Sequence, residues 1–206
     1  MKQGISVNRN NSFGELHDLS LADRLGRYLS TRKAQSVFSS QSIRIAADIG
    51  CGYEAKIGRF LFSKAEVLYL VDISVKQNGV ASNELIHEGY LPDVLKEFEE
   101  ASLDAILMNN VLEHLTDIDG TLKSLYRLMN HKGVLFINVP TWRGKWFLEQ
   151  AAFRLGIAPR EEMNDHKMYF DLENLWPRLV GAGFRPDAIK CKTHKFGMNL
   201  YAVCKK

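Results

Sequence analysis

The sequence predicts an α/β fold in which helices cover both faces of a parallel sheet. An apolar run at 43–49 is long enough for a strand that is buried on both faces, as parallel strands usually are. Gly50 and Gly52 follow it and predict a sharp turn into a helix. A second apolar run at 67–71 then ends at Asp72. Strand, glycine turn, helix and strand in this order are typical of α/β domains.

Two segments show helical periodicity, one inside this unit and one before it. Ile57, Phe60 and Leu61 stand at i, i+3 and i+4, which predicts that the helix after the glycine turn buries this face. Leu21, Leu25, Tyr28 and Leu29 mark an apolar helix face earlier in the chain. We therefore divide the chain into 1–40, a polar flexible segment followed by a helical cap, and 41–206, a single domain.

The later elements follow from the same patterns. Leu122, Leu125, Tyr126 and Met129 predict an amphipathic helix that ends at the segment 130–133. A further helix is predicted around 172–179, although Pro177 inside it removes a backbone hydrogen bond at a cost of about 3 kcal/mol unless the helix kinks or begins later. Two strands, 187–193 and 198–204, are predicted to form a hairpin.

The glycine turn and Asp72 have the chemistry of a nucleotide-type cofactor site. Glycines allow a ligand to lie on the backbone, helix N–H groups face bound oxygen atoms, and an aspartate can accept hydrogen bonds from two ribose hydroxyls. The segment 50–55 also fits the G-x-G-x-x-G/A pattern, with Asp72 at about the 20-residue spacing typical of NAD sites. Asp48, however, would repel a pyrophosphate and favours the ammonium and sulfonium groups of S-adenosylmethionine.

These motifs resemble those of the class I S-adenosylmethionine-dependent methyltransferases. The segments 48–52 (Asp-Ile-Gly-Cys-Gly), 72–74 and 103–115 match the family's motifs in order, and 132–140 and 179–184 resemble its fifth strand and its last helix ending. The resemblance implies a Rossmann-like three-layer sandwich whose seven-stranded sheet is mostly parallel with its last strand antiparallel. It also implies S-adenosyl-L-methionine as the cofactor, bound by Asp48, Gly50, Cys51, Gly52, Asp72, Ile73, Gly89, Tyr90, Asn109, Asn110 and Val111.

The chain departs from the family pattern at two positions. Ala55 replaces the third loop glycine, which narrows the clearance without closing the site. Tyr90 follows Gly89 where relatives commonly place an aspartate against the adenine amino group. Tyr90 can stack on the adenine face, or the contact can pass to backbone atoms.

Composition restricts the class of protein. The chain has 206 residues, is 46% hydrophobic and 25% charged, and carries a net charge of +3, which is too mild to indicate nucleic-acid binding. Cys51, Cys191 and Cys204 have no metal-ligand spacing and offer no disulfide framework, so we expect no metal. We expect a cytoplasmic enzyme because the start of the chain lacks the apolar core of a signal peptide. The oligomeric state is left open.

The acceptor site is expected beyond the carboxyl ends of the strands, at 109–114 and in a lid-like insertion at about 140–170. We expect Trp142, Arg143 and Tyr169 to contact the acceptor. Aromatic residues interleaved with cations suit an anionic or glycosidic substrate, or a membrane surface contacted through 142–154. A helical lid with aromatic residues in the core and solvated cations explains the same composition.

The predicted reaction is methyl transfer to a small-molecule acceptor, with O-methylation slightly favoured because histidines are available as bases. The candidates are His114 and, in a position where relatives often carry a histidine, His166. His87, His131 and His194 are interpreted as surface or turn residues. The acceptor is interpreted as a sugar, a glycan or a lipid-linked intermediate. The alternatives are an NAD-dependent oxidoreductase and a non-catalytic protein that binds the cofactor or a partner.

Overall fold

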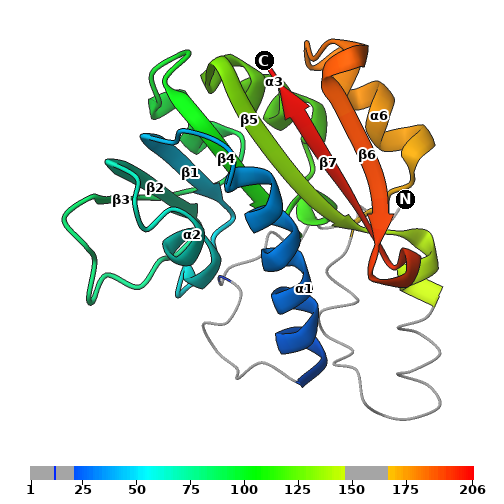
Figure 1. The fold of residues 1–206 in the computed structure, drawn as a ribbon, viewed down its shortest axis with the longest axis horizontal. Coiled ribbons are helices and arrows are strands. Elements are labelled where there is room, and N and C mark those ends of the chain that lie inside the picture. The colour runs from blue at the N-terminus through cyan, green and yellow to red at the C-terminus, as the bar shows by residue number, and fades with distance from the viewer. Residues whose placement is uncertain (1–11, 13–20, 147–166) are drawn as a thin grey trace, which may run out of the picture.

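The fold is built on a seven-stranded sheet with the strand order β3-β2-β1-β4-β5-β7-β6 (Figure 1). The computed structural model describes residue 12 and residues 21–146 and 167–206. All neighbours from β3 to β5 are parallel, whereas β7 runs antiparallel to both β5 and β6. The strands are β1 (Ile45–Ile49), β2 (Val67–Asp72), β3 (Glu84–Glu88), β4 (Leu103–Asn109), β5 (Met129–Pro140), β6 (Ile189–His194) and β7 (Asn199–Lys205). The predicted mostly parallel sheet with an antiparallel last strand is confirmed.

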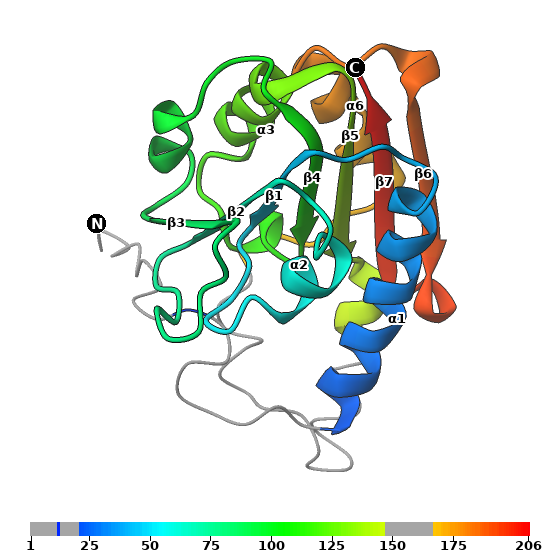
Figure 2. The ribbon, with the colours of Figure 1, turned by 60° about the vertical axis from the view of Figure 1, so that its left-hand side comes forward.

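Helices form a layer on each face of this sheet, as predicted for a three-layer sandwich. Helices α1 (Leu21–Phe38) and α2 (Lys56–Leu61) lie on one face, and α3 (Ile118–Leu128) and α6 (Leu172–Gly181) lie on the other (Figures 1 and 2). Each layer encloses its own buried apolar core against the sheet. Short 3₁₀ turns at 93–97, 112–114, 186–188 and 195–197 complete the described elements. Within the described ranges, no helix has the length and apolar character needed to cross a membrane.

The apolar face predicted for α1 is wrong. Leu25, Tyr28 and Leu29 are 60%, 58% and 37% exposed, and the side chain of Leu21 lies outside the described residues. The helix instead packs on the sheet through Ser30, Ala34 and Phe38. The small side chains at 30 and 34 allow close approach, and the ring of Phe38 makes edge contacts with Phe62 and Phe136, at 5.0 and 6.3 Å between centroids.

The helix after the glycine turn is shorter than its periodicity suggests. It contains six residues, and Phe60 is 57% exposed rather than buried. Its buried residue is Gly58, where an added Cβ would lie 2.5 Å from Oδ2 of Asp48. Phe62, just beyond the helix, fills the core in place of Phe60. The tight packing of a glycine therefore sets which face of α2 meets the sheet.

The two later helices and the hairpin agree with their patterns in outline. Helix α3 ends at Leu128, and the predicted stop segment 130–133 belongs to the first residues of β5, with Lys132 in the left-handed region at φ 85°. Strands β6 and β7 form the predicted hairpin, joined through Lys195–Gly197. Helix α6 begins at Leu172 with Asp171 in a capping box and continues through Pro177 to Gly181. It therefore does not begin later than the proline.

We expect Pro177→Ala to stabilise the protein. Alanine restores a backbone N–H inside α6, which stabilises a helix interior by about 3 kcal/mol. The unfolded chain of the variant is more flexible, which lowers the free energy of unfolding by about 1 kcal/mol. Urea unfolding should thus give a free energy of unfolding about 2 kcal/mol higher. The core truncation Leu175→Ala, at a fully buried position, should lower it by about 2–5 kcal/mol. An unchanged or lower stability of Pro177→Ala would contradict a strained helix.

Candidate functional site

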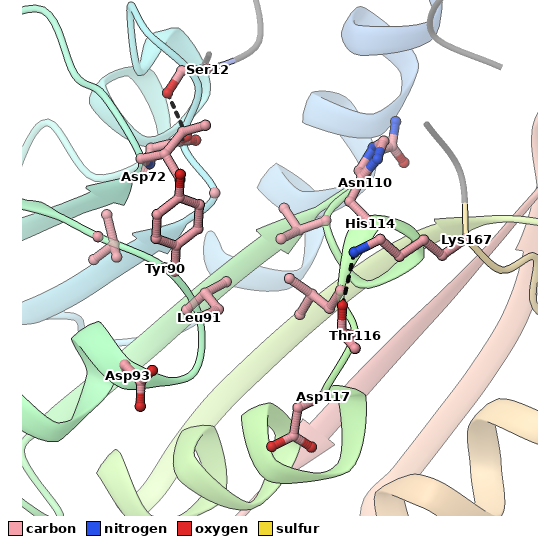
Figure 3. A pocket seen from close by; sticks show the side chains of 16 residues that line it. Ser12, Asp72, Tyr90, Leu91, Asp93, Asn110, His114, Thr116, Asp117 and Lys167 are labelled. Atoms are coloured by element: carbon pink, nitrogen blue, oxygen red, sulfur yellow. Dashed lines mark hydrogen bonds between the residues drawn. The ribbon is translucent and has the colours of Figure 1, made fainter. Parts of the chain in front are cut away.

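A cavity of about 430 Å³ opens at the carboxyl ends of β1, β2 and β4 (Figure 3). This is the position where strand order reverses in an open α/β sheet and where ligands bind. Its volume falls in the range of about 300–1,000 Å³ found for small-molecule pockets. Eight of the predicted site residues line it: Gly50, Asp72, Ile73, Gly89, Tyr90, Asn110, Val111 and His114. The cavity therefore brings together predicted residues that lie as far apart in the sequence as positions 50 and 114.

The glycine turn forms the floor of this cavity. Gly50 and Gly52 adopt φ of 72° and 73°, which L side chains rarely tolerate. An added Cβ on Gly50 would lie 2.2 Å from Cγ2 of Val111, so a side chain cannot be placed there. The N–H groups of Gly50 and Cys51 donate to the carbonyl oxygen of Val71 at 2.7 and 3.1 Å. Both glycines are thus needed for the turn, and Gly50 leaves its backbone open to the cavity.

Asp72 stands at the end of β2 with its carboxylate held by backbone donors. Oδ2 accepts a hydrogen bond from the N–H of Gly52 at 2.7 Å, and Oδ1 accepts one from the N–H of Ile73 at 2.8 Å. Ser12, which the sequence did not indicate, also donates its hydroxyl to Oδ1 at 2.5 Å. A carboxylate oxygen can accept more than one hydrogen bond. The side chain is therefore oriented before any ligand binds, with Ser12 beside it in the cavity wall (Figure 3).

Asp48 lies behind the glycine turn and not in the cavity wall as described. Its side chain is 2% exposed, and Oδ2 accepts a hydrogen bond from the N–H of Gly58 at 2.9 Å. The pKa of Asp48 is raised to about 7, mainly by burial and also by the negative charge of Asp72, although the Gly58 hydrogen bond acts in the opposite direction. Cys51 and Gly52 also lie beside the wall, and burial first of all raises the pKa of the Cys51 thiol.

The opposite wall follows β3. Gly89, Tyr90 and Leu91 line the cavity, and the Tyr90 ring is 49% exposed. Gly89 packs closely on Val94, since an added Cβ would lie 3.0 Å from Cβ of that residue. Asp93, which the sequence analysis missed, places a carboxylate in the same wall, three residues after Tyr90. The signal that could have identified Asp93 is its place in the sequence, shortly after the end of β3 and close to Gly89 and Tyr90.

Amides and a histidine form a polar network beside the cavity. Nδ2 of the fully buried Asn138 donates to Oδ1 of Asn109 at 3.0 Å and to Oδ1 of Asn110 at 2.7 Å. Oδ1 of Asn138 lies 2.6 Å from Nε2 of His194, so that nitrogen must be the donor. Burial, followed by the charges of Lys195 and Lys33, lowers the pKa of His194 to about 4. His194 is therefore a neutral, half-buried residue, and its interpretation as a surface or turn residue is wrong.

This network joins elements that the sequence does not place together. Asn110 adopts φ of 57° and lines the cavity, whereas Asn109 does not reach the described wall. Ser30 of α1 also lies within hydrogen-bonding distance of Nδ2 of Asn138, at 3.3 Å. The sequence analysis missed Asn138 and Ser30 because a single polar residue in an apolar strand or helix is not a distinctive pattern.

His114 occupies the other end of the cavity, together with Lys167. His114 ends the 3₁₀ turn Leu112–His114 after β4. Nζ of Lys167 donates to Oγ1 of Thr116 at 2.8 Å, and the backbone N–H of Lys167 donates to the carbonyl oxygen of Glu113 at 2.8 Å (Figure 3). This end of the cavity therefore carries an imidazole and a cation, while the Asp72 end carries a carboxylate. His166, the second candidate base, lies outside the described residues.

The residues predicted to bind the acceptor form a separate aromatic cluster after β5. The rings of Trp142 and Tyr169 are 5.4 Å apart, and Nζ of Lys145 lies 5.4 and 5.7 Å from their centroids. Tyr169 is buried, whereas Trp142 is 51% exposed. Arg143 packs near Gly197 of the β6–β7 turn. None of the three lines the described cavity, and the segment 147–166 of the predicted lid lies outside the described residues.

Comparisons with known proteins agree with this architecture. Residues 47–137 match the model of a family described as "Methyltransferase domain". An S-adenosylmethionine-dependent methyltransferase from Archaeoglobus fulgidus superposes with a TM-score of 0.65 at 16% identity, covering 87% of this chain and 94% of that one. A second, from Mesorhizobium loti, gives a TM-score of 0.62 at 10% identity, covering 89% and 99%.

An O-methyltransferase family protein from Burkholderia thailandensis gives a TM-score of 0.60 at 12% identity, covering 89% of this chain and 59% of that one. Among curated proteins, none matches the sequence. The match over 47–137 includes the glycine turn, Asp72 and the strand that leads to His114. Residues 47–137 thus match a methyltransferase domain, and the chain has the fold of solved S-adenosylmethionine-dependent methyltransferases.

Proposed function

We propose that the cavity binds S-adenosylmethionine between Asp72 and His114 and that the acceptor enters at the His114 end. The observation that carries this proposal is the polarity of the cavity, with an oriented carboxylate at one end and an imidazole beside a lysine at the other. The site fits the cofactor because the Gly50 backbone is bare at the cavity wall, where a ligand can lie directly on it. No side chain can stand at this position, since its Cβ would clash with Val111. The cofactor supplies an electrophilic methyl group on a sulfonium.

Each wall has a proposed role. The Asp72 carboxylate accepts hydrogen bonds from the ribose hydroxyls, in competition with the Ser12 hydroxyl at Oδ1. The Tyr90 ring, with Gly89 and Leu91, covers the adenine, and Asp93 is close enough in sequence to take the place of the aspartate that Tyr90 replaces. Asp48, Cys51, Gly52 and Asn109 support the wall from behind. Above its pKa of about 7, the charge of Asp48 then acts on the cofactor's cations without direct contact.

The proposed acceptor is a small molecule with a hydroxyl group, so that the reaction is an O-methylation. Because the leaving group is already activated, the protein contributes mainly by holding the acceptor oxygen in line with the methyl carbon. As the new C–O bond forms and the S–C bond breaks, the hydroxyl proton passes to the imidazole of His114. The nearby Lys167 cation, held on Thr116, suits an acceptor that carries an anionic group.

A sugar, a glycan or a lipid-linked intermediate remains the proposed acceptor class. The support is the cluster of Trp142, Tyr169 and Lys145 after β5, on the same edge of the sheet as the cavity. Aromatic faces stack on sugar rings, and a cation over an aromatic ring is already arranged in this cluster. Of the segment 142–154 predicted to touch a membrane, residues 142–146 lie in the described part. The oxidoreductase alternative has no support from the family match, which is to a methyltransferase domain.

We expect the Asp72 carboxylate to hold the ribose hydroxyls of the cofactor. Asp72→Ala should weaken S-adenosylhomocysteine binding by about 1–3 kcal/mol, because it removes the acceptor for the ribose hydroxyls. Titration calorimetry measures this directly, with NAD as a comparison ligand that should not bind. Glu88→Ala is the matched control, since Glu88 ends the neighbouring strand, accepts from the N–H of Val75 at 2.7 Å and does not line the cavity. Equal affinity of Asp72→Ala and the wild type would refute the ribose assignment.

The stability of the protein should depend on pH through Asp48. The pKa of Asp48 is about 7 when folded and about 4 when unfolded, so the folded state binds one more proton between these values. The free energy of unfolding should therefore fall as the pH rises from about 4 to about 7. Asp48→Asn keeps an acceptor for the Gly58 N–H but cannot ionise, so it should flatten this dependence. Urea unfolding at several pH values tests it, and parallel curves for the two proteins would show that Asp48 does not titrate as described.

We expect His114 to accept the proton of the acceptor hydroxyl. His114→Ala should lower kcat for a hydroxyl acceptor by about 10²–10⁴-fold while leaving S-adenosylhomocysteine affinity nearly unchanged. His114→Gln should not restore the rate, because an amide cannot accept the proton. His131→Ala, an exposed histidine at the start of β5, is the control. If His114→Ala turns over at the wild-type rate across the pH range, proton transfer belongs to another group.

A further inference from the structure

The apolar stripe of α1 that is predicted to be buried lies instead on the surface. Leu25, Tyr28 and Leu29, at i, i+3 and i+4, are each more than a third exposed. Phe196, at the β6–β7 turn, is 89% exposed, and Trp146 is 63% exposed. Single exposed apolar residues are ordinary, but large ones gathered from three segments indicate a binding surface.

Contacts show that these three segments adjoin one another. An added Cβ on Gly26 of α1 would lie 3.8 Å from Nζ of Lys195 in the β6–β7 turn. The same turn touches the segment 141–146, because Oγ1 of Thr141 donates to the carbonyl oxygen of Gly197 at 2.7 Å. Figures 1 and 2 both show the turn and this segment beside the lower half of α1. We call this surface, made by 24–38, 141–146 and 189–198, the α1 face.

The α1 face also concentrates the positive charge of the protein. Its three segments contain no Asp or Glu, although the whole chain has 24 acidic and 27 basic residues. The remainder of the chain is therefore net acidic, and the small overall charge of +3 conceals a strong asymmetry. The three segments contain nine cationic residues: Arg24, Arg27, Arg32, Lys33, Arg143, Lys145, Lys190, Lys192 and Lys195.

The strand at the sheet edge points its lysines toward this face. Ile189 and Cys191 of β6 pack in the core on the α6 side. Because side chains alternate along a strand, Lys190 and Lys192 lie on the α1 side, and both are exposed. Lys33 of α1 reaches over the ring of Tyr201 in the adjacent strand at 5.2 Å. Edge strand and helix thus form one continuous basic surface.

The turn that carries Phe196 is conformationally strained. Lys195 and Phe196 adopt φ of 51° and 58°, and Gly197 follows at 82°. L residues other than glycine are strained in the left-handed region, and such strain collects at binding sites. The strain here directs a phenyl ring into solvent, which gives the isolated protein no compensating burial. Phe196 therefore has the position and exposure of a side chain that inserts into a partner.

We propose that the α1 face binds the surface of an anionic lipid bilayer. Exposed Leu, Phe and Trp side chains enter the boundary between headgroups and acyl chains, while the surrounding Lys and Arg attract anionic headgroups. Aromatic rings and cations alone would also suit nucleic acid. The exposed side chains of Leu25 and Leu29 favour a lipid surface instead, because nucleic-acid binding does not call for aliphatic side chains. The inference is independent of methyl transfer, although docking in this way would place the carboxyl edge of the sheet near the membrane.

Vesicle binding by the purified full chain, without cofactor, tests the proposal. Co-sedimentation should be strong with vesicles of phosphatidylcholine containing phosphatidylglycerol, weak with phosphatidylcholine alone, and reduced by salt. Lys190→Glu/Lys192→Glu should weaken binding by about tenfold or more. Lys64→Glu/Lys123→Glu makes the same change in net charge at exposed positions outside the face and should bind as the wild type does.

Phe196→Asn separates binding from folding. Asparagine tolerates the left-handed region, so the variant should melt at or above the wild-type temperature, yet it should lose about tenfold in vesicle affinity. Phe60→Asn removes an aromatic ring that is 57% exposed outside the face and should keep full vesicle binding. Equal binding to both vesicle types, or unchanged affinity of Phe196→Asn, would overturn the proposal. So would preferential binding of single-stranded RNA, or a dimer in solution that Phe196→Asn disrupts.

Discussion

The contact between the Gly50 backbone and the Val111 side chain is the constraint on which the site depends. It joins the loop after β1 to the loop after β4. These two parallel strands are neighbours at the point where the order of the strands in the sheet reverses. Any side chain at position 50 would separate these loops, because its Cβ would lie within 2.2 Å of Val111. The cavity keeps its shape because the two loops are in contact at a residue without a Cβ.

The polar groups around this contact are oriented in advance. Asp72 is held by two backbone N–H groups, and Asn110 is held by Asn138, which in turn is bonded to His194. A buried polar group without a hydrogen-bond partner lowers the stability of a protein by about 1–3 kcal/mol. The network therefore has a single favourable arrangement, in which its buried groups are paired. Because His194 and Ser30 belong to the hairpin and to α1, both outer elements help to position the cavity wall.

The same two outer elements carry the basic and apolar α1 face. Lys195 follows His194 directly, and burial lowers the pKa of Lys195 to about 8, although the charge of Glu113 favours the protonated form. The hairpin turn is therefore in electrostatic contact with the loop after β4 on one side and exposes Phe196 on the other. The segment that bears Phe196 is thus connected to the region of the cavity through Glu113 and through the contacts of His194 with Asn138 and of Asn138 with Asn110.

Local patterns in the sequence determined the succession of strand, glycine turn, helix and strand in the first half, and the place of Asp72, because a buried strand, a left-handed turn and a strand-ending carboxylate each need particular residue types. The buried face of α1, the exposure of Phe60 and the role of His194 were decided by tertiary structure. Periodicity shows that a helix has an apolar stripe, but whether that stripe or a row of small residues meets the sheet depends on how closely the helix can approach. The Asn138 network and the charge asymmetry likewise arise only when distant segments meet.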